Sequence, residues 1–324
     1  MIGLPKDIVT VSELKKYFFT RQGTVRAVDT VSFSVKEGET FGLVGESGSG
    51  KTTVAHTLVG IYKPTAGNVF YKNQNMSVVA QKRPMALKQD IRIVFQDPGS
   101  SLNPRWSIKQ ALSVPLKVHR VKSSNNDRLE RTKELLRMVE LPPEEYLYKY
   151  PQAMGGGEKQ MVAIARALAS DPSFVILDEP TSSLDVSVQA KIISLLIQLQ
   201  KKLKLTYLFI THDLSLMRNT ADRVAIMYLG KISEVASTTE FFQKPLHPYT
   251  KMLLSSIPVV TEEEEALKPK KVISKGEIPS PVNLPTGCSF HLRCPEKIDI
   301  CPKIDPTMVE AEEGHMVSCH LFKS

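Results

Sequence analysis

Long apolar runs are scarce in this sequence. Apolar stretches such as FVILD at Phe174 to Asp178 and TYLFIT at Thr206 to Thr211 have the length of a β-strand. A helix that crosses a bilayer needs about 20 apolar residues, so we expect no membrane-spanning segment. The N-terminus also lacks the apolar core and small-residue cleavage site of a secretory signal, which predicts a location in the cytoplasm.

Cysteine is absent from the first 287 residues, and all four cysteines lie in the last part of the chain. Their spacing is C-x5-C-x6-C-x17-C. Because disulfides are disfavoured in a reducing cytoplasm, this cluster indicates free thiols, a four-thiolate zinc site or an iron–sulfur cluster. The spacing lacks the C-x2-C pair of many zinc sites and does not decide among the three. The cysteines are Cys288, Cys294, Cys301 and Cys319.

Positive charge exceeds negative charge, with 42 Lys and Arg against 34 Asp and Glu. The basic residues are scattered and interleaved with acidic ones, which is typical of an ordinary solvated surface. A nucleic-acid-binding protein gathers its basic residues on one patch or stripe. We therefore expect no nucleic-acid partner, although a mild basic excess also suits the anionic inner face of a membrane.

The order of predicted elements favours an α/β fold. Short β segments between residues 8 and 44 lead into a glycine-rich loop, and strands then alternate with helices, as in a mainly parallel sheet. Between about residues 99 and 165, apolar residues recur every three or four positions, which predicts a helical insertion. No internal repeat is visible, which indicates one such unit rather than two in tandem.

A change in composition predicts a boundary after residue 245. The chain of 324 residues, 42% of them apolar, can bury a full core and still carry an appended module. Residues 1–245 are expected to form the main domain and residues 246–324 an extension. This extension begins with a Pro-rich linker, whose acidic run Glu262 to Glu265 we expect to be solvated, and ends in the four-cysteine module.

The strongest local signal is GESGSGKT, which matches the phosphate-loop pattern G-x-x-x-x-G-K-[ST] between a buried strand and a helix. In such a loop the backbone amides and the helix N-terminus bind an anion, Lys51 reaches the outer phosphates, and the Thr52 hydroxyl binds Mg²⁺. The sequence thus predicts a nucleoside triphosphate site. Its predicted phosphate-binding residues are Gly45, Glu46, Ser47, Gly48, Ser49, Gly50, Lys51, Thr52 and Thr53.

A second chemical signal is FVILDEP, an apolar strand that ends in two carboxylates. Asp178 can hold Mg²⁺ through water, and Glu179 can orient or polarise an attacking water. His212 follows the next strand and is predicted to contact the γ-phosphate. Together with the phosphate loop, these residues predict hydrolysis of the bound nucleotide.

These motifs, taken in order, resemble those of the ABC transporter ATPases. IVFQDP resembles the Q-loop of that family, GGGEKQMVAIARAL its signature helix, and SSLD its D-loop, with Ser183 and Asp185. The resemblance implies a P-loop NTPase core with an antiparallel β subdomain and a helical insertion. It also implies that Phe18, or alternatively Tyr17, stacks on adenine. The implied magnesium ligands are Thr52, Gln96 and Asp178, and the implied catalytic residues are Glu179, His212 and Gln96.

Four further segments narrow the resemblance to the di- and oligopeptide importers and extend it over nearly the whole chain. They are RAVDTVSFSV, FQDPGSSLNPR, HPYTKMLLSSIP and GEIPSPVNLPTGCSFHLRCP. The resemblance implies ATP and Mg²⁺ as cofactors and a peripheral place on the cytoplasmic face of the membrane. The implied partners are a second ATPase subunit, two transmembrane permease subunits and an extracellular solute-binding protein. Similar tails imply a [4Fe-4S] cluster on the four cysteines, with Zn²⁺ as the alternative.

One departure from the family pattern concerns the signature L-S-G-G-Q. The aligned residues here are Met154, Gly155, Gly156, Gly157 and Glu158, so Gly155 replaces the serine that donates to the γ-phosphate of the partner's nucleotide. The resemblance then predicts a slow partner site. Since a homodimer would carry this defect twice, it favours a heterodimer.

Other functions stay open on the sequence alone. Peptide is the implied substrate, with oligosaccharide or nickel as alternatives, and a mainly regulatory nucleotide-gated subunit is a further alternative because of the altered signature. A soluble ABC ATPase of repair or translation would show tandem ATPase units or a long coiled-coil insertion. The sequence shows neither.

Overall fold

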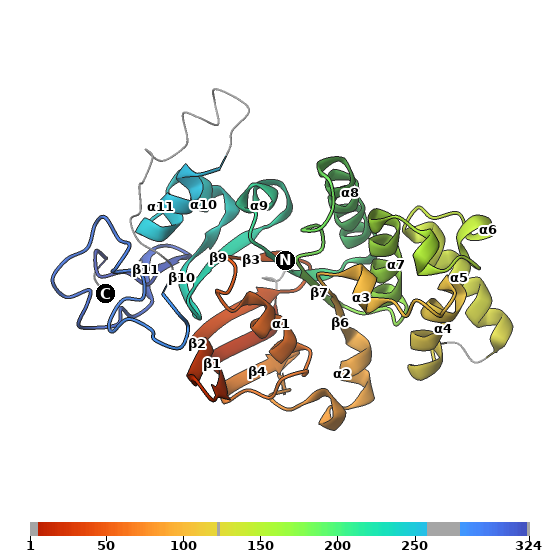
Figure 1. Ribbon diagram of the computed structural model, residues 1–324, viewed down its shortest axis with the longest axis horizontal. Coiled ribbons are helices and arrows are strands. Elements are labelled where there is room, and N and C mark those ends of the chain that lie inside the picture. The colour runs from red at the N-terminus through yellow and green to blue at the C-terminus, as the bar shows by residue number, and fades with distance from the viewer. Residues whose placement is uncertain (1–5, 122–123, 258–278, 323–324) are drawn as a thin grey trace, which may run out of the picture. The chain divides into compact units, whose positions relative to one another are not determined.

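A computed structural model describes residues 6–121, 124–257 and 279–322 (Figure 1). The acidic run Glu262 to Glu265 lies outside these residues. Within the described ranges, the helices are too short or too polar to cross a bilayer. The chain divides into two compact units: the first comprises Met1–Lys36, Thr40–Val79 and Thr211–Ser324, and the second Glu37–Glu39 and Ala80–Ile210.

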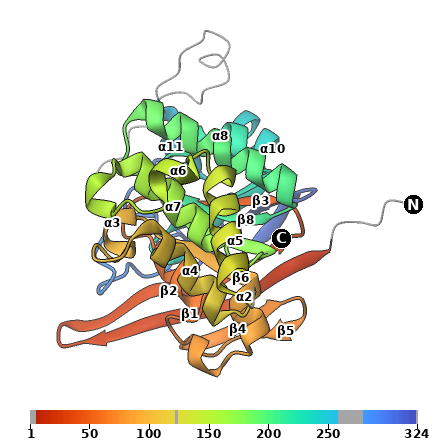
Figure 2. The same ribbon diagram turned by 90° about the vertical axis from the view of Figure 1, so that its right-hand side faces the viewer.

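An antiparallel sheet opens the first unit. Its strand order is β2 (Gly23–Lys36), β1 (Asp7–Thr20), β4 (Ala66–Tyr71) and β5 (Gln74–Asn75). β1 and β2 form the long ribbon seen in Figure 2. Alternate residues of β2 are buried, as a half-buried strand requires. The antiparallel β subdomain is thus confirmed, with strands longer than the short segments predicted from the sequence.

A second sheet in the first unit carries the strand that leads into the glycine-rich loop. β3 (Thr40–Val44) pairs in parallel with β9 (Arg223–Tyr228), and β10 (Lys231–Ser237) returns antiparallel to β9. β12 (His315–Val317) then pairs with β10, and β11 (Val309–Glu312) with β12. Because the tail strands continue this sheet, the boundary after residue 245 remains a prediction.

In the described part of the first unit, helices pack beside the strands. They are α1 (Lys51–Leu58), α9 (Leu214–Thr220), α10 (Thr238–Gln243) and α11 (Pro248–Ser255). The last three each begin after a side chain that accepts a hydrogen bond from a backbone amide of the first turn. Those capping residues are Asp213, Ser237 and His247. In Figure 1, α10 and α11 lie beside β10.

The second unit is built on three parallel strands, β6 (Ile91–Val94), β7 (Phe174–Asp178) and β8 (Thr206–Thr211). Every residue of β7 is buried, which explains its continuous apolar run, because a parallel strand is covered on both faces. The register places Ile176 of β7 opposite Ile93 of β6 and Leu208 of β8. Parallel pairing confirms the predicted α/β class.

Helices make up the rest of the second unit. A short turn η1 (Ala80–Lys82) and α2 (Met85–Asp90) precede β6, and α8 (Val186–Leu203) connects β7 to β8. The predicted helical insertion is present, with α4, α5 and α7 packed together in Figure 2. Its elements are α3 (Pro98–Ser101), α4 (Ile108–Val118), α5 (Asn125–Met138), α6 (Pro143–Tyr146), η2 (Pro151–Ala153) and α7 (Gly156–Leu168).

Candidate functional site

The glycine-rich loop connects β3 to α1 in a path that only glycine can follow at two positions. Gly50 has a φ of 106° and caps the start of α1. A Cβ added there would lie 2.0 Å from the Ala27 carbonyl oxygen, and one added to Gly45 would lie 2.1 Å from the Met227 carbonyl oxygen. Both distances are far below van der Waals contact, so the loop needs glycine for space as well as for conformation.

Lys51 directs its ammonium group into this loop. The side chain is buried, and its Nζ donates to the carbonyl oxygens of Gly45 at 2.8 Å and Glu46 at 3.0 Å. Thr52 and Thr53 follow in the first turn of α1, both half-buried. The loop therefore combines a buried cation with a helix N-terminus, and both favour an anion.

In the second unit, two carboxylates stand at the end of β7. Asp178 is buried, and Glu179 follows with a φ of 46° in the left-handed region. This backbone conformation is uncommon for a residue with a side chain and is typical of functional sites. The Glu179 carboxylate accepts a hydrogen bond of 3.0 Å from the exposed Gln96 amide. The structure thus brings together the two residues predicted to act on water and magnesium.

The start of α7 explains part of the altered signature. Glu158 accepts hydrogen bonds from the Gly155 amide at 2.8 Å and from the Tyr146 hydroxyl. The Tyr146 hydroxyl is the main cause that lowers the pKa of Glu158. Glu158, at the third helical position, therefore makes the return half of a capping box, and Gly155 has no side chain to make the other half.

Gly155 itself leaves room for a side chain. Its φ is −71°, and a Cβ added there would meet only the Glu158 carboxylate, at 3.8 Å. Gly157 is different, because a Cβ there would lie 2.5 Å from a methyl carbon of Val188 in α8. Packing against α8 thus excludes a side chain at Gly157, the third glycine of the signature, but leaves room for one at Gly155, the first.

The D-loop residues lie just before α8. Asp185 caps this helix by accepting from the Val188 amide at 3.0 Å and the Ser187 hydroxyl at 2.6 Å. Ser183 is exposed, and so is Val186, whose side chain is 82% accessible. Such an exposed branched apolar side chain beside the signature helix is suited to contact with a partner.

Comparisons with known proteins agree with this arrangement of motifs. The ABC transporter family matches residues 28–182, and the oligopeptide/dipeptide transporter C-terminal region matches residues 233–301. The oligopeptide transport ATP-binding protein AppF of Bacillus subtilis is 45% identical, with 98% of each chain covered. OppF of Escherichia coli, which has the same description, is 40% identical, with 97% of this chain and 96% of its own covered. The chain belongs to the ABC transporter ATPases.

A solved structure of this ABC ATPase family shows the same fold. The ATP-binding cassette MJ0796, solved as a dimer in a post-hydrolysis state with ADP and phosphate, superposes with a TM-score of 0.63 at 30% identity. The superposition covers 71% of this chain and 98% of the cassette. The P-loop NTPase fold predicted from the sequence is therefore confirmed.

The aromatic residues predicted to hold adenine in this ABC ATPase lie on β1 in the first unit. Phe18 is half-buried, and its ring meets that of Tyr62 edge-on, with 5.2 Å between the ring centres. The Lys16 ammonium lies 4.9 Å from the centre of the Phe18 ring. Tyr17 donates its hydroxyl to Asp29, and burial is the main cause that raises its pKa to about 12. Their role in adenine stacking stays a prediction.

His212 of the ABC ATPase is exposed and follows directly on β8. The next residue, Asp213, fixes the start of α9 by accepting from the Ser215 amide at 2.9 Å. The imidazole is therefore carried on a short segment between two regular elements. Its contact with the γ-phosphate stays a prediction.

All four cysteines of the ABC ATPase lie in the described residues 279–322, and all four are free thiols. Cys288, Cys301 and Cys319 are buried, and the Cys288 amide donates to the Cys301 carbonyl at 2.8 Å. Burial, with the charges of the neighbouring thiols adding to it, raises the pKa of Cys288 to about 11 and that of Cys294 to about 12. Within residues 279–322 and the other described ranges, the side chains form no group of three or more that could hold a metal ion. The metal prediction is therefore not confirmed.

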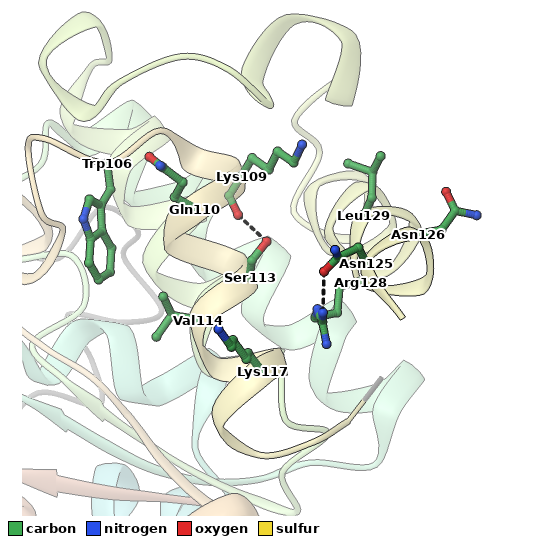
Figure 3. Close-up of a pocket in the computed structure, with 10 residues that line it drawn as sticks. All are labelled: Trp106, Lys109, Gln110, Ser113, Val114, Lys117, Asn125, Asn126, Arg128 and Leu129. Atoms are coloured by element: carbon green, nitrogen blue, oxygen red, sulfur yellow. Dashed lines mark hydrogen bonds between the residues drawn. The ribbon is translucent and has the colours of Figure 1, made fainter. Parts of the chain in front are cut away.

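A surface pocket of about 800 Å³ lies between α4 and α5 of the ABC ATPase (Figure 3). Its lining includes the exposed ring of Trp106 and the cationic groups Lys109, Lys117 and Arg128. The pocket shares no lining residue with the predicted ATP site.

Sequence analysis missed two residues that contact the phosphate loop of this ABC ATPase. The Glu46 carboxylate accepts from the Tyr249 hydroxyl at 3.1 Å and from Arg293 at 3.0 Å. Both partners lie beyond residue 245, Tyr249 on α11 and Arg293 beside Cys294 in the four-cysteine module. No spacing within the sequence indicates these contacts, because Arg293 is 247 positions away from Glu46.

Proposed function

We propose that this ABC ATPase binds and hydrolyses MgATP to energise peptide import through partner membrane subunits. The observation that carries the proposal is the buried Lys51 ammonium held inside a loop that requires glycine. A buried cation surrounded by inward-facing backbone is suited to a polyphosphate and to few other ligands.

The proposed roles follow from the chemistry of each side chain. Residues Gly45 to Thr53 cradle the phosphates, while Thr52, Gln96 and Asp178 supply the oxygen ligands that Mg²⁺ prefers. The ion would screen the negative charge of the phosphates. Glu179 polarises the attacking water, and its carboxylate is oriented for this by the Gln96 amide. His212 contacts the γ-phosphate, and Phe18, or alternatively Tyr17, stacks on adenine.

Peptide import is proposed from the C-terminal region and from the relatives. Residues 233–301 match the oligopeptide/dipeptide transporter C-terminal region, and AppF and OppF are described as oligopeptide transport ATP-binding proteins. The proposed partners are two permease subunits and an extracellular solute-binding protein. In this assembly the chain would lie on the cytoplasmic face of the membrane.

Transport by the reconstituted assembly tests this function. Vesicles that contain the chain, its permease subunits and its binding protein are expected to accumulate labelled di- or oligopeptide only when ATP is supplied to the side of this chain. Omitting the chain should reduce accumulation to background. Accumulation of oligosaccharide or nickel with no uptake of peptide would contradict the proposed substrate class.

We also propose a heterodimer with a second ATPase subunit, in which each site joins one phosphate loop to the partner's signature. The exposed Val186 beside the D-loop supports contact with a partner. Gly155 supports the heterodimer, because two copies of this chain would both lack the signature hydroxyl.

Gly155→Ser is expected to raise ATP turnover at the partner's site by about tenfold. The backbone φ of −71° and the open space around Gly155 accept serine without strain, and a hydrogen bond to a charged group contributes about 1.5–3 kcal/mol. The rate is measured in heterodimers whose other site is silenced by Glu179→Gln. Gly157→Ala is the matched control and should give no gain, since its methyl group would collide with Val188. An unchanged rate for Gly155→Ser would refute the role of the missing hydroxyl.

The four thiols are proposed to bind a [4Fe-4S] cluster, with Zn²⁺ as the alternative. Four cysteines within residues 288–319 offer the thiolate ligands that such a cluster needs, and a bound cation would favour the thiolate forms that burial disfavours. Protein purified anaerobically is expected to be brown and to contain about four iron atoms and acid-labile sulfide per chain. Zinc would support the alternative, and a metal-free module would refute both.

A further inference from the structure

Glu46 is an acidic residue placed inside a loop that has to receive a polyanion. Its carboxylate is bound at both oxygens by Arg293, with Nη1 at 3.0 Å from Oε2 and Nη2 at 3.4 Å from Oε1. Tyr249 adds a hydroxyl donor at 3.1 Å. The Arg293 side chain is 10% exposed and that of Glu46 is 25% exposed, so water screens this pair only in part.

The backbone of Glu46 belongs to the same network. Its carbonyl oxygen accepts from the Lys51 ammonium at 3.0 Å, and its amide donates to the Tyr249 hydroxyl at 3.3 Å. Glu46 therefore joins the cation of the phosphate loop to residues of the C-terminal extension. A shift of its side chain would be passed to the carbonyl that holds Lys51.

Aromatic rings pack beside the guanidinium of Arg293. Its guanidinium lies 5.9 Å from the ring centres of both Tyr228 and Phe290. These rings pack against Tyr249, at 4.6 Å for Tyr228 and 5.2 Å for Phe290. Tyr228 ends β9 and Phe290 belongs to the four-cysteine module, so residues from two distant segments of the chain form the surface against which the guanidinium lies.

We propose that Arg293, supported by Tyr249, is a positioning residue of the ATP site: it neutralises and orients Glu46 so that the loop accepts the triphosphate. Without Arg293, an uncompensated carboxylate would stand beside the bound phosphates and repel them. The C-terminal extension is then part of the nucleotide site rather than a separate attachment. This inference rests on the proposed function of the phosphate loop.

A double-mutant cycle measures this coupling. Arg293→Ala is expected to weaken equilibrium ATP binding by about tenfold and to raise the KM for ATP by a similar factor, with little change in kcat. Glu46→Gln removes the carboxylate from the loop and is the reference for the double variant. The double variant should bind ATP within about threefold of Glu46→Gln, because the repulsion that Arg293 offsets is then absent. Arg293→Lys should lie between the unmodified chain and Arg293→Ala, since it keeps the charge but not the paired contact.

Matched controls separate positioning from general support of the fold. Lys251→Ala removes the exposed ion pair with Glu296, which also ties the four-cysteine module to α11, and should leave ATP binding unchanged. Arg293→Gln keeps a polar side chain but removes the charge, and it takes the place of Arg293→Ala if that variant does not fold. Lys51→Ala tests the phosphate loop itself. If Lys51→Ala loses ATP affinity and the Arg293 variants keep it, this inference is wrong and the proposed function stands. The inference is also wrong if adding Glu46→Gln to the Arg293→Ala variant does not restore ATP binding.

Discussion

Glu179→Gln is expected to lower ATP hydrolysis in the assembled transporter by at least about 100-fold, while ATP still binds. General acid–base assistance contributes about 10² to 10⁴ to a rate, and the amide cannot polarise water as a carboxylate does. The substitution keeps the size of the side chain, and its amide oxygen can still accept from Gln96. Phosphate release gives the rate, and equilibrium binding of labelled ATP gives the affinity.

The matched control for this prediction is Glu140→Gln, an exposed carboxylate of the same unit that lies 3.7 Å from Lys191. We expect it to leave the rate unchanged, because an exposed ion pair contributes little. Turnover by Glu179→Gln at the rate of the unmodified chain would show that another group activates the water. It would also revive the alternative of a mainly regulatory nucleotide-gated subunit, in which turnover matters less than binding.

The second large effect is expected for Lys51→Ala, which should weaken ATP binding by about 100-fold or more. The buried ammonium already donates to two loop carbonyls, and each charge-assisted contact with phosphate that replaces them contributes about 1.5–3 kcal/mol. Equilibrium binding with labelled ATP measures the loss. The phosphate-loop assignment fails if this variant binds ATP as tightly as the unmodified chain.

Two further variants show whether the loop itself survives. Lys63→Ala removes an exposed lysine shortly after α1 and should bind ATP normally. Lys51→Arg keeps the charge but not the compact ammonium, and it should fold with weakened binding. Thermal unfolding of all three variants, compared with the unmodified chain, separates a lost contact from a lost fold.

The part of the candidate site that could be predicted from the sequence consists of short local motifs. Each of these motifs is a short stretch, and residues that are close in the sequence of such a stretch are also close in space. This holds for the loop from Gly45 to Gly50, the carboxylates after β7 and the position of His212. β7 and β8 have the bounds expected from FVILD and TYLFIT, because a strand buried on both faces reads as a continuous apolar run.

Contacts between segments that are far apart in the chain could not be predicted from the sequence. β12 is three residues long and pairs with β10, more than 80 positions earlier, so no periodic pattern marks it. The same holds for Arg293 beside Glu46. Glu158 occupies the last position of the signature in the sequence, but its capping bonds to Gly155 and Tyr146 emerge only from three-dimensional geometry.

The division of the chain also bears on the order in which it can fold during synthesis. Nearly all of the second unit is continuous, from Ala80 to Ile210, so its segments can meet as soon as they leave the ribosome. The first unit combines residues up to Val79 with residues from Thr211 onward, and its sheet includes β12, which pairs with β10. Since domains generally fold as units and in the order of synthesis, the phosphate loop is translated early but receives Arg293 only near the end. A nascent chain would then have a formed helical insertion long before it has a complete nucleotide site.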